Sequence, residues 1–232
     1  EFDNLAEANG FIVVYPDGTP LPRIPGRVWN GGACCGVAME GRDNVDDVGF
    51  LSALITSLER SQPVDSQRVF VTGHSNGAIM SMRLACELSD RIDGVAVQSG
   101  TFEVDDCRPD RAMPLLSIHG TADANIPIDG GTGSGPSGTR FASPQAGVEH
   151  FARLAGCPAP VETTDSGNPA VTHRVWQPCR DDVTVEMTLV EGAHHAWMGH
   201  DPPPRENAPD QARIDRDFDS SLAVWTFLAG IR

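Results

Sequence analysis

Short apolar runs rich in β-branched residues alternate along the chain with segments whose apolar side chains recur at helical spacing. The apolar runs predict strands at residues 11–15, 68–72, 94–98, 114–118 and 183–190. The amphipathic segments predict helices at 48–58, 76–88, 143–154 and 214–228, the last with Phe218, Leu222, Trp225 and Leu228 facing the sheet. This alternation is typical of an α/β fold, in which helices cover both faces of a mostly parallel sheet.

The size and charge of the chain narrow its class. A chain of 232 residues, 40% hydrophobic and 21% charged, predicts a single domain over residues 1–232. The formal charge of −15 repels nucleic acids and anionic lipids, so we expect neither as a partner. No apolar run approaches the ~18 residues of a membrane helix, so we expect no membrane span.

The segment Gly73-His74-Ser75-Asn76-Gly77 lies between a predicted strand and a predicted helix. In that context GxSxG forms a nucleophile elbow, a strained turn that exposes the Ser hydroxyl above the sheet. Such a turn tolerates only small residues beside Ser75, which explains the glycines at positions 73 and 77. The alternative is a glycine-rich tight turn without chemistry.

A Ser hydroxyl becomes a good nucleophile only when a base removes its proton and a carboxylate orients that base. After a GxSxG elbow the two follow along the chain in the order Asp, then His. Asp123 comes just after the predicted strand 114–118, whereas its rivals Asp105, Asp106 and Asp129 are not joined directly to a strand. The loop after the strand 183–190 carries two adjacent candidates for the base, His194 and His195. The sequence therefore contains a complete Ser, Asp and His set.

Further segments stand out beside the Ser75 elbow: residues 10–16, Trp29-Asn30 with Cys34-Cys35-Gly36, residues 46–50, 83–86, 119–123 and 192–197. Together with the elbow they resemble one family, the α/β-hydrolases that include extracellular polyhydroxybutyrate depolymerases, feruloyl esterases and acetylxylan esterases. The resemblance spans nearly the whole chain.

The resemblance implies a role for each candidate. His195 aligns with the catalytic His, and His194 stands where a Gly is usual. Ser75 would attack an ester carbonyl, with His195 as base and Asp123 holding the imidazole, and water would release the acyl group. The backbone N–H of Asn76 would be one oxyanion donor.

Three residues are candidates for substrate binding: Trp29, Trp197 and His74. For both tryptophans the alternative is a half-buried packing residue, and His74 is read more simply as structural. We expect no metal and no cofactor, because no zinc-like ligand spacing and no phosphate-binding glycine loop is present.

The six cysteines stand at positions 34, 35, 86, 107, 157 and 179. Disulfides in a secreted protein are the better interpretation, with buried reduced thiols as the alternative. We expect Cys157 to pair with Cys179, because the two flank a polar insertion. Cys34 and Cys35 would then each pair with Cys86 or Cys107.

One part of the family's sheet has no counterpart here. If residues 11–15 form the fourth strand and 68–72 the fifth, the sequence begins after the third strand, whose following loop gives the second oxyanion donor. We therefore expect N-terminal strands to be missing. A fragment of a longer enzyme is the favoured explanation, over a strand from another molecule or a rearranged sheet.

The leading functional hypothesis is a serine esterase acting on feruloyl or acetyl esters of the plant cell wall. A polyester depolymerase is its close rival, since the same triad would serve a small or a polymeric ester. A non-catalytic remnant and a serine peptidase are alternatives from other classes. The sequence makes no prediction about the oligomeric state.

Overall fold

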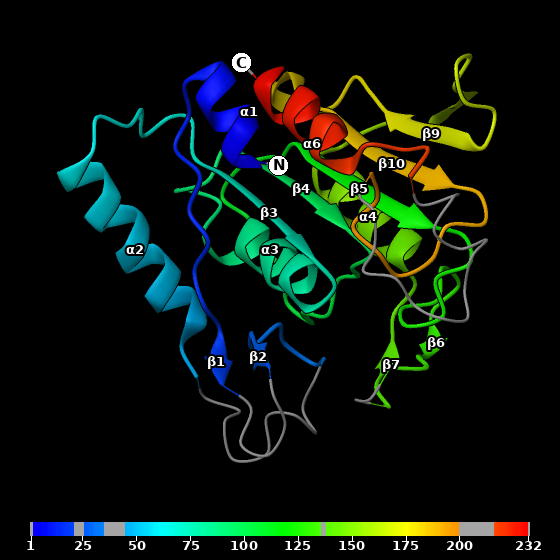
Figure 1. The fold of residues 1–232 in the computed structure, drawn as a ribbon, viewed down its shortest axis with the longest axis horizontal. Coiled ribbons are helices and arrows are strands. Elements are labelled where there is room, and N and C mark those ends of the chain that lie inside the picture. The colour runs from blue at the N-terminus through cyan, green and yellow to red at the C-terminus, as the bar shows by residue number, and fades with distance from the viewer. Residues whose placement is uncertain (1, 21–25, 35–44, 136–137, 200–215, 232) are drawn as a thin grey trace.

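The computed structural model describes residues 2–20, 26–34, 45–135, 138–199 and 216–231. Within them one six-stranded sheet has the order β3-β4-β5-β10-β9-β8 (Figure 1). The strands β3, β4, β5 and β10 run parallel, and β9 and β8 are added antiparallel. Their bounds are β3 Phe70–His74, β4 Gly94–Gln98, β5 Leu115–Gly120, β8 Val161–Thr164, β9 Val171–Trp176 and β10 Val185–Val190.

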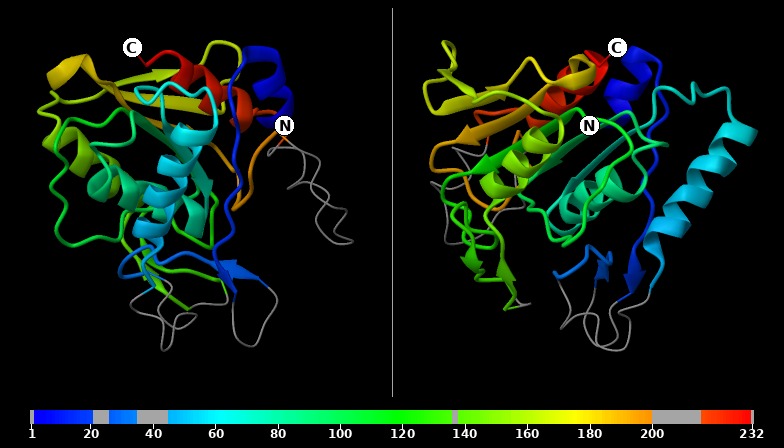
Figure 2. Two further views of the ribbon diagram at one scale, coloured as in Figure 1. Left: turned by 90° about the vertical axis from the view of Figure 1, so that its left-hand side faces the viewer. Right: turned by 180° about the vertical axis from the view of Figure 1, so that it is seen from behind.

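Helices cover both faces of this sheet, as the sequence predicts. α3 (Asn76–Glu87) and α4 (Pro144–Leu154) pack on one face, and α6 (Ser220–Ala229) packs on the other. Figures 1 and 2 show α1 (Phe2–Asn9) lying beside α6. Because β4 and β5 are buried along their whole length between these layers, their sequences carry apolar residues on both faces rather than on alternate positions only.

A long helix, α2 (Asp47–Ser61), stands at the side of the molecule next to β3 and α3 (Figure 2). Its first turn is capped by Asp46, whose carboxylate accepts a hydrogen bond from the N–H of Gly49. Farther along, the Arg91 guanidinium donates to the Glu59 carboxylate at 3.0 Å. These contacts and an apolar stripe that packs on the core hold the predicted 48–58 helix in place.

Short elements lie in the connections. β1 (Thr19–Pro20) pairs with β2 (Arg27–Val28), and β6 (Gly131–Thr132) pairs with β7 (Arg140–Phe141). A 3₁₀ turn, η2, covers Arg180–Asp182. The two small ribbons lie below the main sheet in Figure 1.

The predicted strand at 11–15 is wrong. In the structure this segment pairs with no strand, and Ile12, Val14 and Tyr15 are 49%, 40% and 64% exposed. Its first residue, Phe11, stacks on Trp225 of α6, with ring centroids 4.4 Å apart. An apolar run becomes a strand only beside a partner, and among the described residues β3 ends the sheet without one on its outer side. That further N-terminal strands are missing from the chain stays a prediction.

Two further expectations differ from the structure. The strands β8 and β9 have no predicted counterpart; all four residues of β8 are exposed, so no apolar pattern marks it. In α6, Leu222 is 51% exposed, and Val224 and Leu228 are the apolar residues that are buried. The helix begins at Ser220 rather than 214, so Phe218 precedes it; residues 214 and 215 lie outside the described residues.

The disulfide pairing is partly as expected. Cys157 is bonded to Cys179, but Cys86 is bonded to Cys107 rather than to Cys34 or Cys35. Cys86 and Cys107 lie in the same core cluster, whereas Cys34 belongs to a separate one with Val28, Ile79, Ile126 and Phe141, so Cys34 is not beside either of them. Cys34 is itself disulfide-bonded, and Cys35 lies outside the described residues.

Candidate active site

Ser75 occupies a sharp turn between β3 and α3. Its backbone has φ 56° and ψ −122°, a conformation that a non-glycine residue adopts rarely and at a cost in strain. The N–H of Ser75 donates to the carbonyl of Gln98 on β4, and its own carbonyl accepts from Ile79 in α3. The strand and the helix thus fix the turn from both sides, and this is the geometry that the sequence predicts for an elbow.

The two glycines of the elbow are needed for different reasons. A Cβ on Gly73 would overlap the backbone of Gly77, so only glycine fits at position 73. At Gly77 a Cβ would meet nothing within 4 Å. The expectation that both residues must be small is therefore correct for Gly73, while the side-chain space at Gly77 is open.

Asp123 follows β5 and is buried, with 4% of its surface exposed. Its Oδ1 accepts hydrogen bonds from the N–H groups of Asn125 and Ile126, both at 2.9 Å. Burial by itself would raise the pKa of this carboxyl, but the hydrogen bonds from His195 and Ile126 outweigh it and hold the pKa below its ordinary value. Asp123 is therefore a carboxylate at neutral pH.

His195 lies between Asp123 and Ser75. Its Nδ1 is 2.8 Å from Asp123 Oδ2, and its Nε2 is 2.8 Å from Ser75 Oγ. Because a carboxylate can only accept, Nδ1 carries the hydrogen, and in the neutral ring Nε2 accepts from the Ser75 hydroxyl. The structure thus brings the three predicted residues into one hydrogen-bonded chain, which includes His195 rather than the rival His194.

His74, the last residue of β3, lies beside this chain. Its ring lies 4.8 Å from that of His195 and meets Trp197 edge-on at 6.4 Å. Burial and the neighbouring His195 lower the pKa of His74 to about 4, so its ring is neutral at neutral pH. His74 is therefore a neutral, half-buried neighbour of the base; a role in substrate binding stays a prediction.

Asn76, the first residue of α3, holds a neighbouring loop against the elbow. Its side-chain Oδ1 accepts from the N–H of Trp29 at 2.7 Å, and its Nδ2 donates to the carbonyl of Trp29 at 3.0 Å. The indole of Trp29 is half-buried and stacks on Phe50, with ring centroids 6.3 Å apart. The backbone of Trp29 is thus bonded to the residue after Ser75, and a role of its indole in substrate binding stays a prediction. The predicted role of the Asn76 N–H at an oxyanion stays a prediction.

Trp197 is tied to the opposite helix. Its Nε1 donates to the Ser221 hydroxyl of α6 at 2.9 Å, and its ring meets Phe2 edge-on at 5.8 Å. With its Nε1 bonded and its ring against Phe2, Trp197 has the contacts expected of a packing residue, the alternative from the sequence; a role in substrate binding stays a prediction.

Two residues beside the triad were not predicted to act there. His119, on β5, is fully buried and donates from Nε2 to the carbonyl of Ile126 at 2.9 Å, which closes the turn that carries Asp123. Gln98, at the end of β4, donates to the carbonyl of Ala196. The available signal was a polar residue ending a buried apolar strand, at Val95-Ala96-Val97-Gln98 and at Leu116-Ser117-Ile118-His119.

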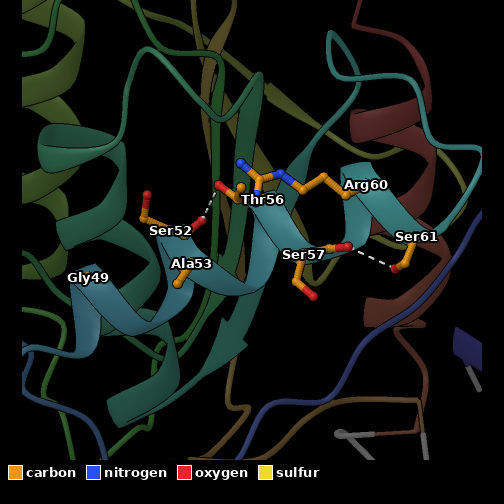
Figure 3. Close-up of a pocket in the computed structure, with 7 residues that line it drawn as sticks. All are labelled: Gly49, Ser52, Ala53, Thr56, Ser57, Arg60 and Ser61. Atoms are coloured by element: carbon orange, nitrogen blue, oxygen red, sulfur yellow. Dashed lines mark hydrogen bonds between the residues drawn. The ribbon is translucent and has the colours of Figure 1, made fainter.

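A groove on α2 is separate from this site. It is lined by the residues shown in Figure 3: Gly49, Ser52, Ala53, Thr56, Ser57, Arg60 and Ser61. The Thr56 and Ser61 hydroxyls donate to carbonyls of their own helix, so they are already used.

Neither a candidate metal site nor a candidate membrane helix occurs in the part of the chain that the structure describes. There, no group of His, Cys, Asp and Glu side chains could hold a metal ion, and none of the helices has the length and apolar character of a membrane span.

Comparisons with known proteins bear on the fold of the chain. A profile of the Phospholipase/Carboxylesterase family matches residues 46–140. An acetyl xylan esterase from Aspergillus awamori superposes with a TM-score of 0.57 at 19% identity, over 84% of this chain and 76% of that one. The chain has the α/β-hydrolase fold. This confirms the predicted fold class.

Sequence relatives of this α/β-hydrolase are esterases by name. Feruloyl esterase B of Piromyces equi is 28% identical over 195 residues, which are 81% of this chain and 34% of that protein. A bifunctional acetylxylan esterase/xylanase of Neocallimastix patriciarum is 21% identical over 84% of this chain and 26% of its own length. A probable feruloyl esterase C of Aspergillus niger is 32% identical over 63% of this chain and 58% of its own length.

These relatives confirm the resemblance to feruloyl and acetylxylan esterases. The α/β-hydrolase chain spans about a third of the first relative's length, 34%, and about a quarter of the second's, 26%.

Proposed function

We propose that this chain is a serine carboxylic-ester hydrolase. The observation that carries the proposal is the hydrogen-bonded chain from Ser75 Oγ through His195 to Asp123, with both contacts at 2.8 Å. The nucleophile, the base and the orienting carboxylate are within hydrogen-bond reach without any rearrangement. Esterase relatives support the reaction class.

The geometry supports a two-step reaction. As Ser75 Oγ attacks the ester carbonyl, His195 Nε2 takes its proton, and Asp123 stabilises the imidazolium that forms. His195 then returns the proton to the departing alcohol, leaving an acyl group on Ser75. A water molecule, deprotonated by the same Nε2, hydrolyses that acyl-enzyme and regenerates the Ser75 hydroxyl. The N–H of Asn76 would stabilise the oxyanion in both steps.

The substrates we propose are feruloyl or acetyl esters of plant-wall polysaccharides. Relatives named for feruloyl and acetylxylan ester hydrolysis support this class, and the backbone of an aromatic residue, Trp29, is bonded to the side chain of Asn76, the residue after the nucleophile. A polymeric polyester as substrate stays a prediction from the sequence. We also propose that the protein is secreted, since its disulfides require an oxidising compartment.

The test compares hydrolysis of p-nitrophenyl acetate and methyl ferulate by the wild type, by Ser75→Ala and by Ser117→Ala. Ser117 is a buried serine of β5 and serves as the matched control, because the same Oγ is removed away from the triad. Turnover that is lost only in Ser75→Ala supports the proposal. A folded wild type that neither turns over nor reacts with a fluorophosphonate would favour the non-catalytic remnant.

A further inference from the structure

One buried side chain joins the nucleophile turn to the loop that carries the base. Gln98 is the last residue of β4 and has no exposed surface. Its backbone carbonyl accepts the N–H of Ser75 at 3.1 Å. Its side-chain Nε2 donates to the carbonyl of Ala196, directly after His195 in the chain. The same residue thus contacts the nucleophile, Ser75, and the neighbour of the base, Ala196.

The loop that receives this hydrogen bond is a tight turn centred on His195. The N–H of Ala196 donates to the carbonyl of His194 at 2.9 Å, a bond that spans two residues and makes His195 the middle of the turn. Ala196 is therefore held at its N–H by the turn itself and at its carbonyl by Gln98. Rotation of the turn, which would carry His195 Nε2 away from Ser75, is opposed at the adjacent peptide.

Packing alone does not account for an amide at this position. The Ala196 carbonyl can only accept, so the atom facing it is the Gln98 amide nitrogen. The amide oxygen, Oε1, is buried and has no hydrogen-bond partner among the described residues. A Met or Leu side chain would fill similar space without burying an unpaired oxygen, whereas only a donor can hold Ala196.

We propose that Gln98 is a positioning residue for catalysis: it fixes the His194–Ala196 turn so that His195 Nε2 stays at hydrogen-bond distance from Ser75 Oγ. The inference rests on the proposed function, and it makes two separate claims that can be measured. Without Gln98 the turn should move, and ester hydrolysis should slow at the chemical step.

The first experiment replaces Gln98 by Met, which keeps the volume and removes the donor. We expect kcat on p-nitrophenyl acetate to fall by about 10-fold to 100-fold with little change in KM, since a displacement of about 1 Å costs as much. The melting temperature should stay equal or rise. Ser117→Ala, which removes another buried unpaired polar atom on the opposite face of the sheet, should leave kcat unchanged.

The second variant, Gln98→Glu, tests the donor itself. A buried carboxyl has a raised pKa, and its neutral form can donate to Ala196 as the amide does. We expect activity close to the wild type at low pH and an additional loss as the introduced carboxyl ionises with rising pH. The titratable groups that face this turn are His74, His119 and Asp123. Burial lowers the pKa of His74 to about 4 and also lowers the pKa of His119, so both rings are neutral at neutral pH.

A readout without turnover separates this inference from the proposed function. The low-field proton NMR signal of the His195 Nδ1–H bond to Asp123 should be sharp in the wild type and in Ser117→Ala, and lost or broadened in Gln98→Met. If the wild type hydrolyses no ester, the proposed function fails, and this signal alone decides the inference. An unchanged signal and a kcat within about twofold of the wild type in Gln98→Met would overturn it.

Discussion

At the scale of single residues, the two oxygens of Asp123 have separate partners. Oδ1 is held by two backbone N–H groups of its own loop, and Oδ2 is left for His195. The backbone thereby sets the orientation of the carboxylate before the base is engaged. All these partners donate hydrogen bonds, so the side chain at position 123 must accept at both of its oxygens, as a carboxylate does.

Replacing Asp123 by Asn should therefore be severe. The amide keeps the shape but must point an N–H either at the backbone N–H groups or at His195 Nδ1, which favours the wrong tautomer of the ring. We expect kcat to fall by about 10⁴-fold. Initial rates with p-nitrophenyl acetate, normalised by active-site titration, would measure this. A loss of less than about tenfold would show that Asp123 is not the orienting group.

At the scale of elements, the strand-turn-helix unit around Ser75 depends on a close approach of two backbones. The backbone of Gly77 lies where a Cβ on Gly73 would be, and between the two glycines Ser75 has a positive φ. A matched pair of substitutions separates the two glycines. Gly73→Ala should cost about 1–3 kcal/mol through overpacking and distort the turn, so that hydrolysis is lost as well.

Gly77→Ala should behave in the opposite way for stability. The added Cβ enters open space in the first turn of α3, where Ala is favoured over Gly by up to about 1 kcal/mol. Urea unfolding of both variants beside the wild type would measure the difference. Equal destabilisation by the two substitutions would contradict the reason given for Gly73.

The success of prediction also differs from element to element. The strands β4 and β5 and the helix α3 are predictable because burial on both sides of the sheet makes their apolar pattern unambiguous. β8 is not, since all its residues are exposed and only its pairing with β9 makes it a strand. Residues 11–15 have the composition of a strand without a partner, and composition does not show whether a partner is present.

For the candidate site, the motif and its order along the chain predict Ser75, Asp123 and His195. The supporting residues escape prediction for a physical reason. His119 acts through its hydrogen bond to Ile126, and Gln98 through its hydrogen bond to Ala196. A single polar residue at a strand end does not indicate which loop will pack against it. The Cys86–Cys107 bond escapes likewise, because pairing depends on which core cluster each cysteine joins.

At the scale of the whole molecule, buried and half-buried histidines make the stability depend on pH. Burial lowers the pKa of His74 from 6.5 to about 4, and it also lowers those of His119 and His150. Between these pH values the unfolded chain binds more protons than the folded one, so stability falls as pH falls. Asp123, with its lowered pKa, adds a loss at the acid end, below about pH 4.

We therefore expect the free energy of unfolding to drop as the pH is lowered from 6.5 to about 4, with about 3 kcal/mol of the drop due to His74. Chemical unfolding at several pH values would measure the slope. His74→Gln, which cannot be protonated, should give a flatter profile than the wild type. A parallel profile for that variant would show that His74 is not one of the groups responsible.

The three residues of the site come from distant parts of the chain. His195 is 120 positions from Ser75 and 72 from Asp123, and each of them is carried by a different strand connection. Such contacts close late in folding, because long loops must be ordered before they form. Recovery of ester hydrolysis after dilution from denaturant should therefore lag behind recovery of the helical circular-dichroism signal, which makes activity a gauge of the last folding step.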